Sequence, residues 1–206
     1  MNLLFTGASG FLGYNVLPLL KKKYSVETIG LTSQDDYIVN LAAEIPKLAG
    51  KYDVILHVAG KAHSLPKTEA EKRLFFDVNL QGTKNLCTAL EQSGIPKSFI
   101  FISTVAVYGC DSGENITEEY PLNGTTPYAL SKIKAEKYLE EWCAMHNVKL
   151  SILRPSLIAG PNPPGNLGAM IHGIKSGKYL SIAGGKAQKS VLMVQDIANL
   201  VPLLIE

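Results

Sequence analysis

Thr6-Gly7-Ala8-Ser9-Gly10-Phe11-Leu12-Gly13 joins a short apolar run to a helical pattern near the start of this 206-residue chain. Leu3-Leu4-Phe5 precedes it and predicts a strand, and the apolar residues that follow recur at helical spacing. Between a strand and a helix, glycines let the backbone approach an anion, and the free amides and the helix dipole face it. Gly7, Gly10 and Gly13 fit the roles of tight turn, close approach and helix-to-strand packing, so the stretch predicts a diphosphate-binding loop.

Strand and helix patterns alternate along the rest of the chain. Expected strands are Val26–Ile29, Val54–Val58, Ser98–Ser103, Lys149–Leu153 and, more weakly, Asp36–Val39; expected helices are Ala42–Leu48, Glu69–Gln92, Tyr128–His146 and Gln195–Leu204. Such alternation indicates an α/β protein with a Rossmann-type, doubly wound parallel sheet. Pro18 lies inside the first helix, where a kink is expected.

The alternation is interrupted at 155–168, a stretch rich in Pro, Gly and Asn. This favours a boundary there, with a dinucleotide-binding domain carrying the catalytic residues at 1–154 and a partial substrate-binding region at 155–206. The apolar residues of the last helix suggest that a segment which should pack on it is missing.

Composition excludes several classes of protein. The net charge is +2 and the lysines are dispersed, so a nucleic-acid partner is not expected. Cys87, Cys110 and Cys143 have no C-x-x-C spacing, which indicates neither a zinc site nor a disulfide framework and favours a reducing, cytoplasmic location. No signal peptide, membrane span or metal site is expected.

Tyr128 and Lys132 lie four residues apart and therefore on one face of the predicted helix. A free tyrosine has a pKa of about 10; a nearby lysine and an oxidised nicotinamide would lower that pKa and make Tyr128 a usable general base. The pair alone also fits an ordinary surface contact. Thr104 favours the functional alternative, because it follows an apolar strand whose carboxyl end is where open α/β sheets bind ligands.

The choice between NAD and NADP stays open. An acidic side chain at the end of the second strand would hold the ribose hydroxyls, but residues 29–34 contain no acid, and Asp35 and Asp36 come several residues late. Thr32 and Ser33 could hydrogen-bond a 2′-phosphate, although no arginine is near to balance its charge.

Four motifs stand in one order and spacing: the glycine loop, residues 103–109 (Ser-Thr-Val-Ala-Val-Tyr-Gly), the tyrosine-lysine pair, and Arg154-Pro155 followed by Gly160-Pro161. Over nearly its whole length the chain resembles the extended short-chain dehydrogenases/reductases, in particular the NAD-dependent nucleotide-sugar epimerase/dehydratase family. The resemblance implies an enzyme in which Thr104, Tyr128 and Lys132 are catalytic. The cofactor contacts it implies, with the loop residues above, are Gly7, Ser9, Gly10, Phe11, Leu12, Gly13, Thr32, Asn40, Leu41, Val58, Ala59, Gly60, Lys61, Ser103, Tyr128, Lys132, Pro155 and Ser156. His57 fits a satisfied core histidine as well as it fits a direct role.

Residues 162–170 and 189–196 resemble the epimerases and 4-keto reductases that act on diphospho-sugars in polysaccharide synthesis, which implies Thr104 and Asn166 as substrate contacts. Dehydration is disfavoured, because Val105-Ala106 offers no acid after the threonine; Ala159 also replaces the family's usual tyrosine. Relatives usually continue further, so we expect a fragment lacking part of the substrate region. The resemblance also implies a homodimer through helices 69–92 and 128–146; a cofactor-binding redox sensor of the same fold is the alternative to an enzyme.

Overall fold

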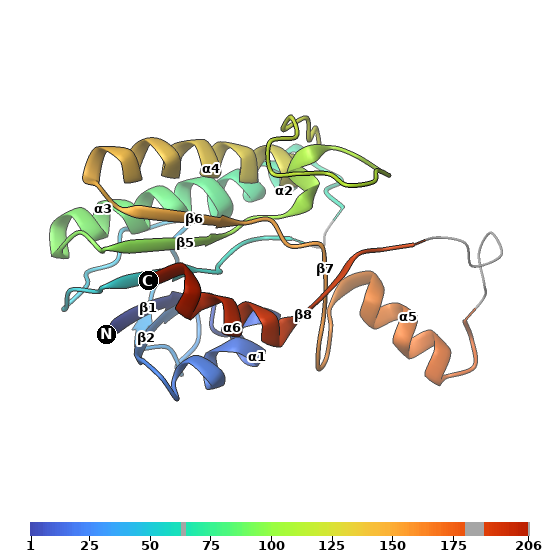
Figure 1. Ribbon diagram of the computed structural model, residues 1–206, viewed down its shortest axis with the longest axis horizontal. Helices are drawn as coiled ribbons and strands as arrows, with labels where there is room; N and C mark the ends of the chain where they lie inside the picture. The colour runs from blue at the N-terminus through green and yellow to red at the C-terminus, as the bar shows by residue number, and fades with distance from the viewer. Residues whose placement is uncertain (63–64, 180–187, 206) are drawn as a thin grey trace.

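A six-stranded parallel sheet forms the centre of the molecule (Figure 1). The computed structural model describes residues 1–62, 65–179 and 188–205. In spatial order β3-β2-β1-β4-β5-β6, the strands are Tyr37–Ile38, Ser25–Gly30, Asn2–Thr6, Val54–His57, Ser98–Ile102 and Lys149–Leu153. The direction of strand order reverses between β1 and β4, so the expected doubly wound sheet is confirmed, and ligands of such sheets bind beyond the carboxyl ends of the strands at that point.

Helices cover both faces of the sheet (Figure 1). On one face lie α2 (Glu69–Phe76), α3 (Gly82–Ser93) and α4 (Pro127–His146), and on the other α1 (Phe11–Leu20) and α6 (Val194–Ile205). Each face has its own apolar core: Leu86 and Trp142 pack with Phe99 on the first, and Val16 and Val201 pack with Phe5 on the second. Burial on both faces explains why β4 and β5 are continuous apolar runs.

Two predicted helices differ from the structure. The segment 42–48 has no helix: a turn ends at residue 43, because Pro46 lacks an amide hydrogen and its ring blocks a helical turn. Residues 69–92 are not one regular helix, because Asp77–Gln81 form a π-helical turn between α2 and α3. Pro18 is accommodated within the single helix α1, without an interruption of its helical assignment.

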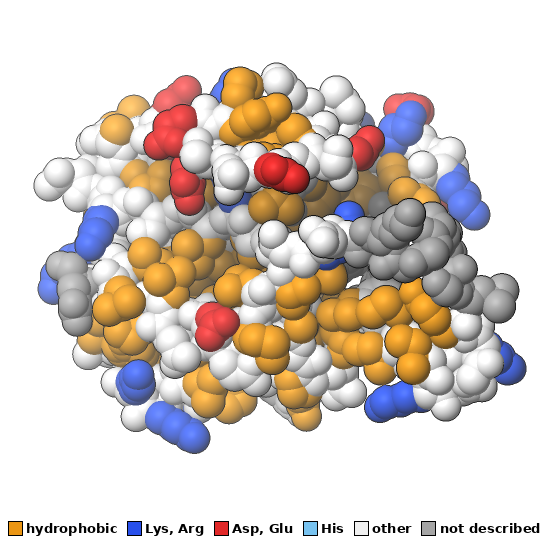
Figure 2. All heavy atoms as spheres, turned by 45° about the vertical axis from the view of Figure 1, so that its right-hand side comes forward, with side chains coloured by type: hydrophobic (Ala, Val, Ile, Leu, Met, Phe, Trp, Pro, Cys, Tyr) orange, Lys and Arg blue, Asp and Glu red, His pale blue; other side chains and the backbone are white. Residues whose placement is uncertain are grey.

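The chain after β6 leaves the sheet and then returns to it (Figure 1). Strands β7 (Leu157–Ala159) and β8 (Val191–Met193) pair in parallel, and α5 (Gly165–Lys175) has no buried residue. Hydrophobic side chains gather on this side of the surface (Figure 2), among them Met170, Ile174, Val191 and Met193.

Helix α6 then packs beside α1. Val201 is fully buried there, so the last helix has a packing partner, although Leu203 stays 66% exposed. None of the helices in the described ranges combines the length and the apolar character needed to cross a membrane.

Candidate active site

The glycine-rich loop joins β1 to the first turn of α1 at the carboxyl edge of the sheet. Gly7 has a φ of 81°, and a Cβ there would lie 2.8 Å from the Ala59 amide nitrogen, so a side chain is excluded on both counts. Gly10 is the N-cap of α1 and offers no side-chain acceptor to the first-turn amides. Those amides and the positive end of the helix dipole therefore remain available for an anion.

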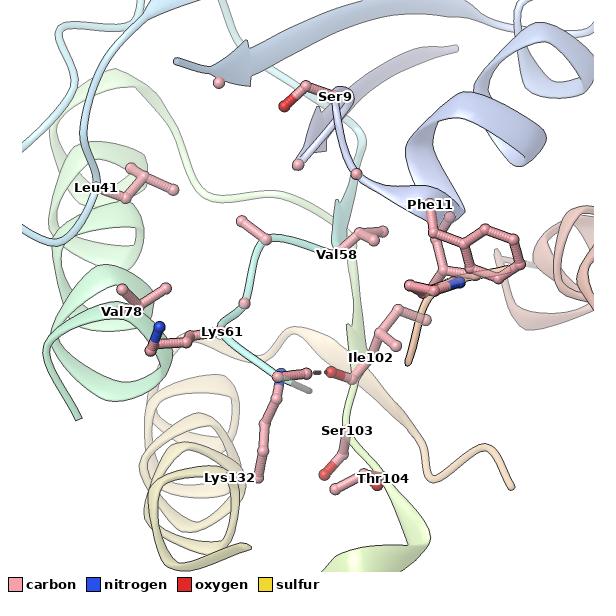
Figure 3. A pocket seen from close by; sticks show the side chains of 18 of the residues that line it. Ser9, Phe11, Leu41, Val58, Lys61, Val78, Ile102, Ser103, Thr104 and Lys132 are labelled. Atoms are coloured by element: carbon pink, nitrogen blue, oxygen red, sulfur yellow. Dashed lines mark hydrogen bonds between the residues drawn. The ribbon is translucent and has the colours of Figure 1, made fainter. Parts of the chain in front are cut away.

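One cavity of about 590 Å³ extends from this loop to the end of β5 (Figure 3). It lies where the strand order reverses, between the carboxyl ends of β1 and β4. Ser9 and Phe11 line it beside α1, and Thr104 and Lys132 line it at the far end. Such a position and size are those of small-molecule and cofactor sites in open α/β folds.

Thr104, Tyr128 and Lys132 come together at this far end of the cavity. Thr104 follows β5, while Tyr128 and Lys132 lie one turn apart on α4. Thr126 caps that helix, accepting a hydrogen bond from the Ala129 amide at 3.1 Å, with Pro127 at the first helical position. Capping thus fixes the start of α4, which places the tyrosine in its first turn.

Burial sets the proton affinities of these groups. It raises the pKa of Tyr128, while the side-chain hydrogen bond with Thr104 works in the opposite direction. Desolvation of the phenolate thus outweighs the hydrogen bond, and the lowering predicted from Lys132 together with an oxidised nicotinamide stays a prediction. Burial also lowers the pKa of Lys132 to about 7, although Glu136 opposes this shift.

The ammonium of Lys132 is held from two sides. Its Nζ donates to the carbonyl oxygen of Ile102 at 2.7 Å, as the dashed line in Figure 3 marks, and lies 4.5 Å from the centre of the Phe101 ring. A Cβ on Gly60 would stand 3.2 Å from Nζ, so the glycine leaves room for the charge at the edge of the cavity.

A buried ion pair supports this end of the site. Glu136, one turn beyond Lys132 and fully buried, is paired with Arg154 at 2.8 Å and accepts a hydrogen bond from the Ser103 hydroxyl. The pair joins α4 to the ends of β5 and β6. Sequence reasoning missed Glu136; the signal was an acid four residues after the lysine and therefore on the same face of the helix.

His57 has a structural environment and does not line the cavity. Its Nδ1 lies 2.6 Å from the Thr6 hydroxyl and its Nε2 lies 2.9 Å from the Thr83 hydroxyl. Because Thr6 already accepts from two backbone amides, its proton goes to Nδ1, and Nε2 carries the imidazole hydrogen. Burial and the charge of Lys132 lower the pKa of His57 to about 3, so the ring is neutral.

The π-helical turn holds one wall of the cavity. Asn79 accepts from the Lys61 amide at 2.7 Å and donates to the Lys61 carbonyl at 3.1 Å. It also donates to the Ser131 hydroxyl at 2.8 Å, which ties α4 to the segment after β4. Turns of this kind recur at functional sites, and Val78 from the same turn lines the cavity.

Most residues singled out from the sequence line the cavity, but three do not. Gly13 packs against the backbone of Ala8, where a Cβ would lie 2.3 Å from the carbonyl oxygen. Thr32 turns away to Asp35, donating from Oγ1 at 2.7 Å, and Asn166 is exposed on α5. Lining residues that the sequence did not single out are mostly apolar: Ile29, Gly30, Leu31, Val39, Ala42, Ala62, Val78, Ile102, Leu157, Ile158 and Pro164. Among the described residues, no cluster of His, Cys, Asp or Glu could hold a metal ion.

Comparison with known proteins identifies the family. The profile of the NAD dependent epimerase/dehydratase family matches residues 3–206. The chain belongs to this family. Within it, the N-acetyl-alpha-D-glucosaminyl-diphospho-ditrans,octacis-undecaprenol 4-epimerase of Escherichia coli O157:H7 is 31% identical over 97% of this chain and 62% of its own length. The UDP-glucose 4-epimerase of Vibrio cholerae is 30% identical over 99% and 65%.

A solved structure of the family also has the same fold. The UDP-N-acetylglucosamine 4-epimerase of Methanobrevibacter ruminantium M1, in complex with UDP-N-acetylmuramic acid, superposes with a TM-score of 0.84 at 24% identity, covering 99% of this chain and 72% of that one. The family member described here spans less than two thirds of the length of these two curated relatives.

Proposed function

We propose that this chain carries the catalytic half of an NAD(P)-dependent epimerase or 4-keto reductase that acts on a nucleoside-diphosphate sugar. The main support is a single cavity at the strand-order reversal that is lined by both the glycine loop and the Thr104, Tyr128 and Lys132 side chains. Its family relatives include 4-epimerases of sugars carried on a diphosphate.

The residues present fit a nicotinamide dinucleotide. The first turn of α1 contains no acidic residue and has no side-chain cap, so a diphosphate would meet free amides there. Val39 and Leu41 give an apolar wall at one end for an adenine, and Pro155 and Ser156 line the other end beside Tyr128. When bound, the nicotinamide would supply the acceptor and donor of hydride.

The side chains of Thr104, Tyr128 and Lys132, at the end of the cavity away from the glycine loop, would transfer the proton of the sugar hydroxyl. Thr104 would hydrogen-bond the reacting sugar oxygen, and Tyr128 would take the hydroxyl proton as the carbon–oxygen bond becomes a ketone and return it on reduction. The positive charge of Lys132 would stabilise the phenolate, offsetting the burial that raises the pKa of Tyr128. Glu136 favours that charged form of Lys132.

Epimerisation and reduction use the same proton chemistry. Reduction of the ketone on its opposite face gives the epimer, whereas reduction of a separate keto-sugar gives a net 4-keto reduction. A redox sensor would not require a threonine, a tyrosine and a lysine at one end of the cavity. The presence of all three there favours an enzyme.

Tyr128→Phe tests the proposal. The variant retains the ring but has no proton to move, so we expect turnover of UDP- and dTDP-sugars to fall at least about a thousandfold, while affinity for the reduced nicotinamide nucleotide changes less than about threefold. Chromatography of the sugar products and nucleotide fluorescence give the two values. Turnover by Tyr128→Phe at the wild-type rate would exclude the assigned role.

The proposal extends to a cytoplasmic homodimer that has no membrane contact. The three cysteines lack any C-x-x-C spacing, which supports a reducing compartment. Helices α2 and α4 expose Leu74 and Leu130, which supports an interface through the layer of α2, α3 and α4. Sedimentation measurements test the dimer, and Leu74→Glu with Leu130→Glu should yield monomers.

A further inference from the structure

A buried histidine lies behind the wall of the cavity and contacts two of the elements that form the site. His57 is the last residue of β4 and is 1% exposed. Its ring nitrogens contact Thr6, the residue before the glycine loop, and Thr83, in the first turn of α3. Both nitrogens therefore have the hydrogen-bond partners that a buried imidazole requires. The proposed proton transfer does not use this side chain.

On the Nδ1 side of the ring, hydrogen bonds hold the glycine loop against the segment after β4. The Thr6 hydroxyl, 2.6 Å from Nδ1, accepts from the amides of Val58 and Ala59 at 3.2 and 3.0 Å. Gly7 follows directly, and a Cβ on it would lie 2.8 Å from the Ala59 amide nitrogen. Because Gly7, Val58 and Ala59 all line the cavity, this side of the ring fixes backbone that a dinucleotide would meet.

On the Nε2 side, hydrogen bonds lead to the helix that carries the proposed proton-transfer residues. The Thr83 hydroxyl, 2.9 Å from Nε2, donates to the Asn79 carbonyl oxygen at 2.7 Å. The Asn79 side chain donates to the Ser131 hydroxyl at 2.8 Å, which in turn donates to the Tyr128 carbonyl oxygen at 2.7 Å. This side of the ring therefore supports the first turn of α4, where Tyr128 lies.

The two threonines fix the same tautomer of His57 independently. The Thr6 hydroxyl accepts from two amides, so its proton is donated to Nδ1. The Thr83 hydroxyl donates its only proton to Asn79, so it can only accept from an Nε2 hydrogen. All the donors thus run in one direction, from the amides after β4 through the ring to the π-helical turn.

This direction requires a neutral ring. The imidazole stacks on Phe101 with the ring centres 5.6 Å apart, and the Lys132 ammonium lies 4.5 Å from the centre of the same Phe101 ring. Burial and the nearby Lys132 charge lower the pKa of His57 to about 3. A protonated ring would carry a hydrogen on both nitrogens and would lose the hydrogen bond from Thr6.

We infer that His57 is a positioning residue for both halves of the proposed reaction: Nδ1 holds the nucleotide-binding loop, and Nε2 holds the start of the helix that carries Tyr128. The inference rests on the proposed function and adds to it a residue outside the cavity. Because each nitrogen has its own partner, the two effects can be separated by substitution.

Two amide substitutions separate the two sides of the ring. His57→Asn places an acceptor near the position of Nδ1 and removes the donor to Thr83. His57→Gln places a donor near the position of Nε2 and removes the acceptor for Thr6. Fluorescence titration of the reduced nicotinamide nucleotide gives the affinity, and chromatography of the sugar products at saturating nucleotide gives the turnover.

The two variants should differ in opposite senses. We expect His57→Asn to lower turnover at least about tenfold more than His57→Gln does, and His57→Gln to weaken nucleotide binding at least about tenfold more than His57→Asn does. A histidine that only stabilises the fold predicts no such split, because each substitution exchanges the ring for an amide and removes one buried hydrogen bond.

Variants at other positions keep the test valid if an amide at position 57 prevents folding. Thr83→Val and Thr6→Val each remove one hydroxyl and preserve the shape of the side chain. They should reproduce the effects of His57→Asn and His57→Gln respectively. His146→Gln, at the last residue of α4, is the matched control and should leave both values within about twofold of the wild type.

The imidazole itself gives a readout that needs neither nucleotide nor sugar. Nitrogen-15 NMR should show a neutral ring with its hydrogen on Nε2 between about pH 5 and pH 9. A hydrogen on Nδ1, or equal effects of the two amide substitutions on affinity and turnover, would overturn the role of His57 alone. If the wild-type protein binds no nicotinamide nucleotide or turns over none of the sugars, the proposed function is overturned and the inference with it.

Discussion

Lys132 has its ammonium group inside the protein, and this has a measurable effect on stability. Its pKa falls from 10.5 to about 7 on folding because of burial, so between these pH values the unfolded chain binds more protons than the folded one. The free energy of unfolding contributed by this residue therefore rises with pH across that window. Burial of the Lys132 charge beside Tyr128 therefore lowers the folding stability near neutral pH.

We predict that the stability difference between the wild-type protein and Lys132→Met depends on pH. From pH 7 to pH 9 the wild-type protein should gain about 2 kcal/mol relative to the variant, because the variant has no proton to lose. Urea unfolding of both nucleotide-free proteins at the two pH values gives the difference. A difference that stays constant with pH would mean that Lys132 is not desolvated as the structure shows.

At the level of single residues, the sequence predicted the backbone of the site better than its side-chain contacts. The glycine loop and the residues of α4 follow from short-range spacing, because a turn and a helix fix their geometry locally. Thr32 was placed in the cofactor site, but its hydroxyl is used by Asp35. The contact of the Asp35 carboxylate with Gly30 could not be predicted, since sequence distance does not show that the loop folds back on β2.

The ion pair between Glu136 and Arg154 links two elements, α4 and the end of β6. Glu136 is fully buried and the Arg154 side chain is 15% exposed, so loss of one partner leaves the other charge desolvated. We predict that Arg154→Met lowers the free energy of unfolding by about 3–5 kcal/mol. Chemical denaturation measures this loss.

The double variant provides the control for this pair. Glu136→Leu in the Arg154→Met background removes the orphaned carboxylate, so the double variant should be more stable than Arg154→Met alone. Simple additivity of the two single losses would show that the charges do not interact through the buried contact.

Among the secondary structure elements, the spacing of apolar residues predicted most strands of the sheet and the long helices. Apart from the weakly predicted 36–39, the predicted strands each match an observed strand to within a residue at either end. The signal was clearest in β4 and β5, whose residues are all buried. The prediction of a helix at 42–48 was wrong, because it relied on the apolar spacing and gave too little weight to Pro46, which interrupts a helix. The π-helical turn depends on the contacts of Asn79 with Lys61 and Ser131, which are distant in sequence.

For the whole molecule, α6 completes the second apolar face of the sheet. Val201 is fully buried (0% exposed) and lies in the core that also contains Phe5 and Val16. We predict that Val201→Ala lowers the free energy of unfolding by about 1–3 kcal/mol, through lost burial and the cavity that remains. Thermal or urea unfolding measures the change.

Leu203 on the same helix is the matched control, because it is 66% exposed. Leu203→Ala should change the stability by less than about 0.5 kcal/mol. Equal losses for the two substitutions would mean that α6 does not pack as described.

For the whole molecule, the sequence did not predict that α6 packs back against the sheet beside α1. The break after Pro155 was visible as a stretch of Pro, Gly and Asn, but the packing of α6 beside α1 brings together the two ends of the sequence. The proposed substrate region is thus represented outside the sheet layers by β7, α5 and β8. Periodicity shows that the last helix has an apolar face but not which surface covers that face.

The central claim is that one cavity holds a nicotinamide dinucleotide between the glycine loop and Tyr128. A crystal structure of the protein with NADH tests this most directly. We predict the diphosphate against the first-turn amides of α1 and the nicotinamide ring beside Tyr128 and Pro155. A dinucleotide bound with its diphosphate away from α1, or with its nicotinamide out of reach of Tyr128, would contradict the account.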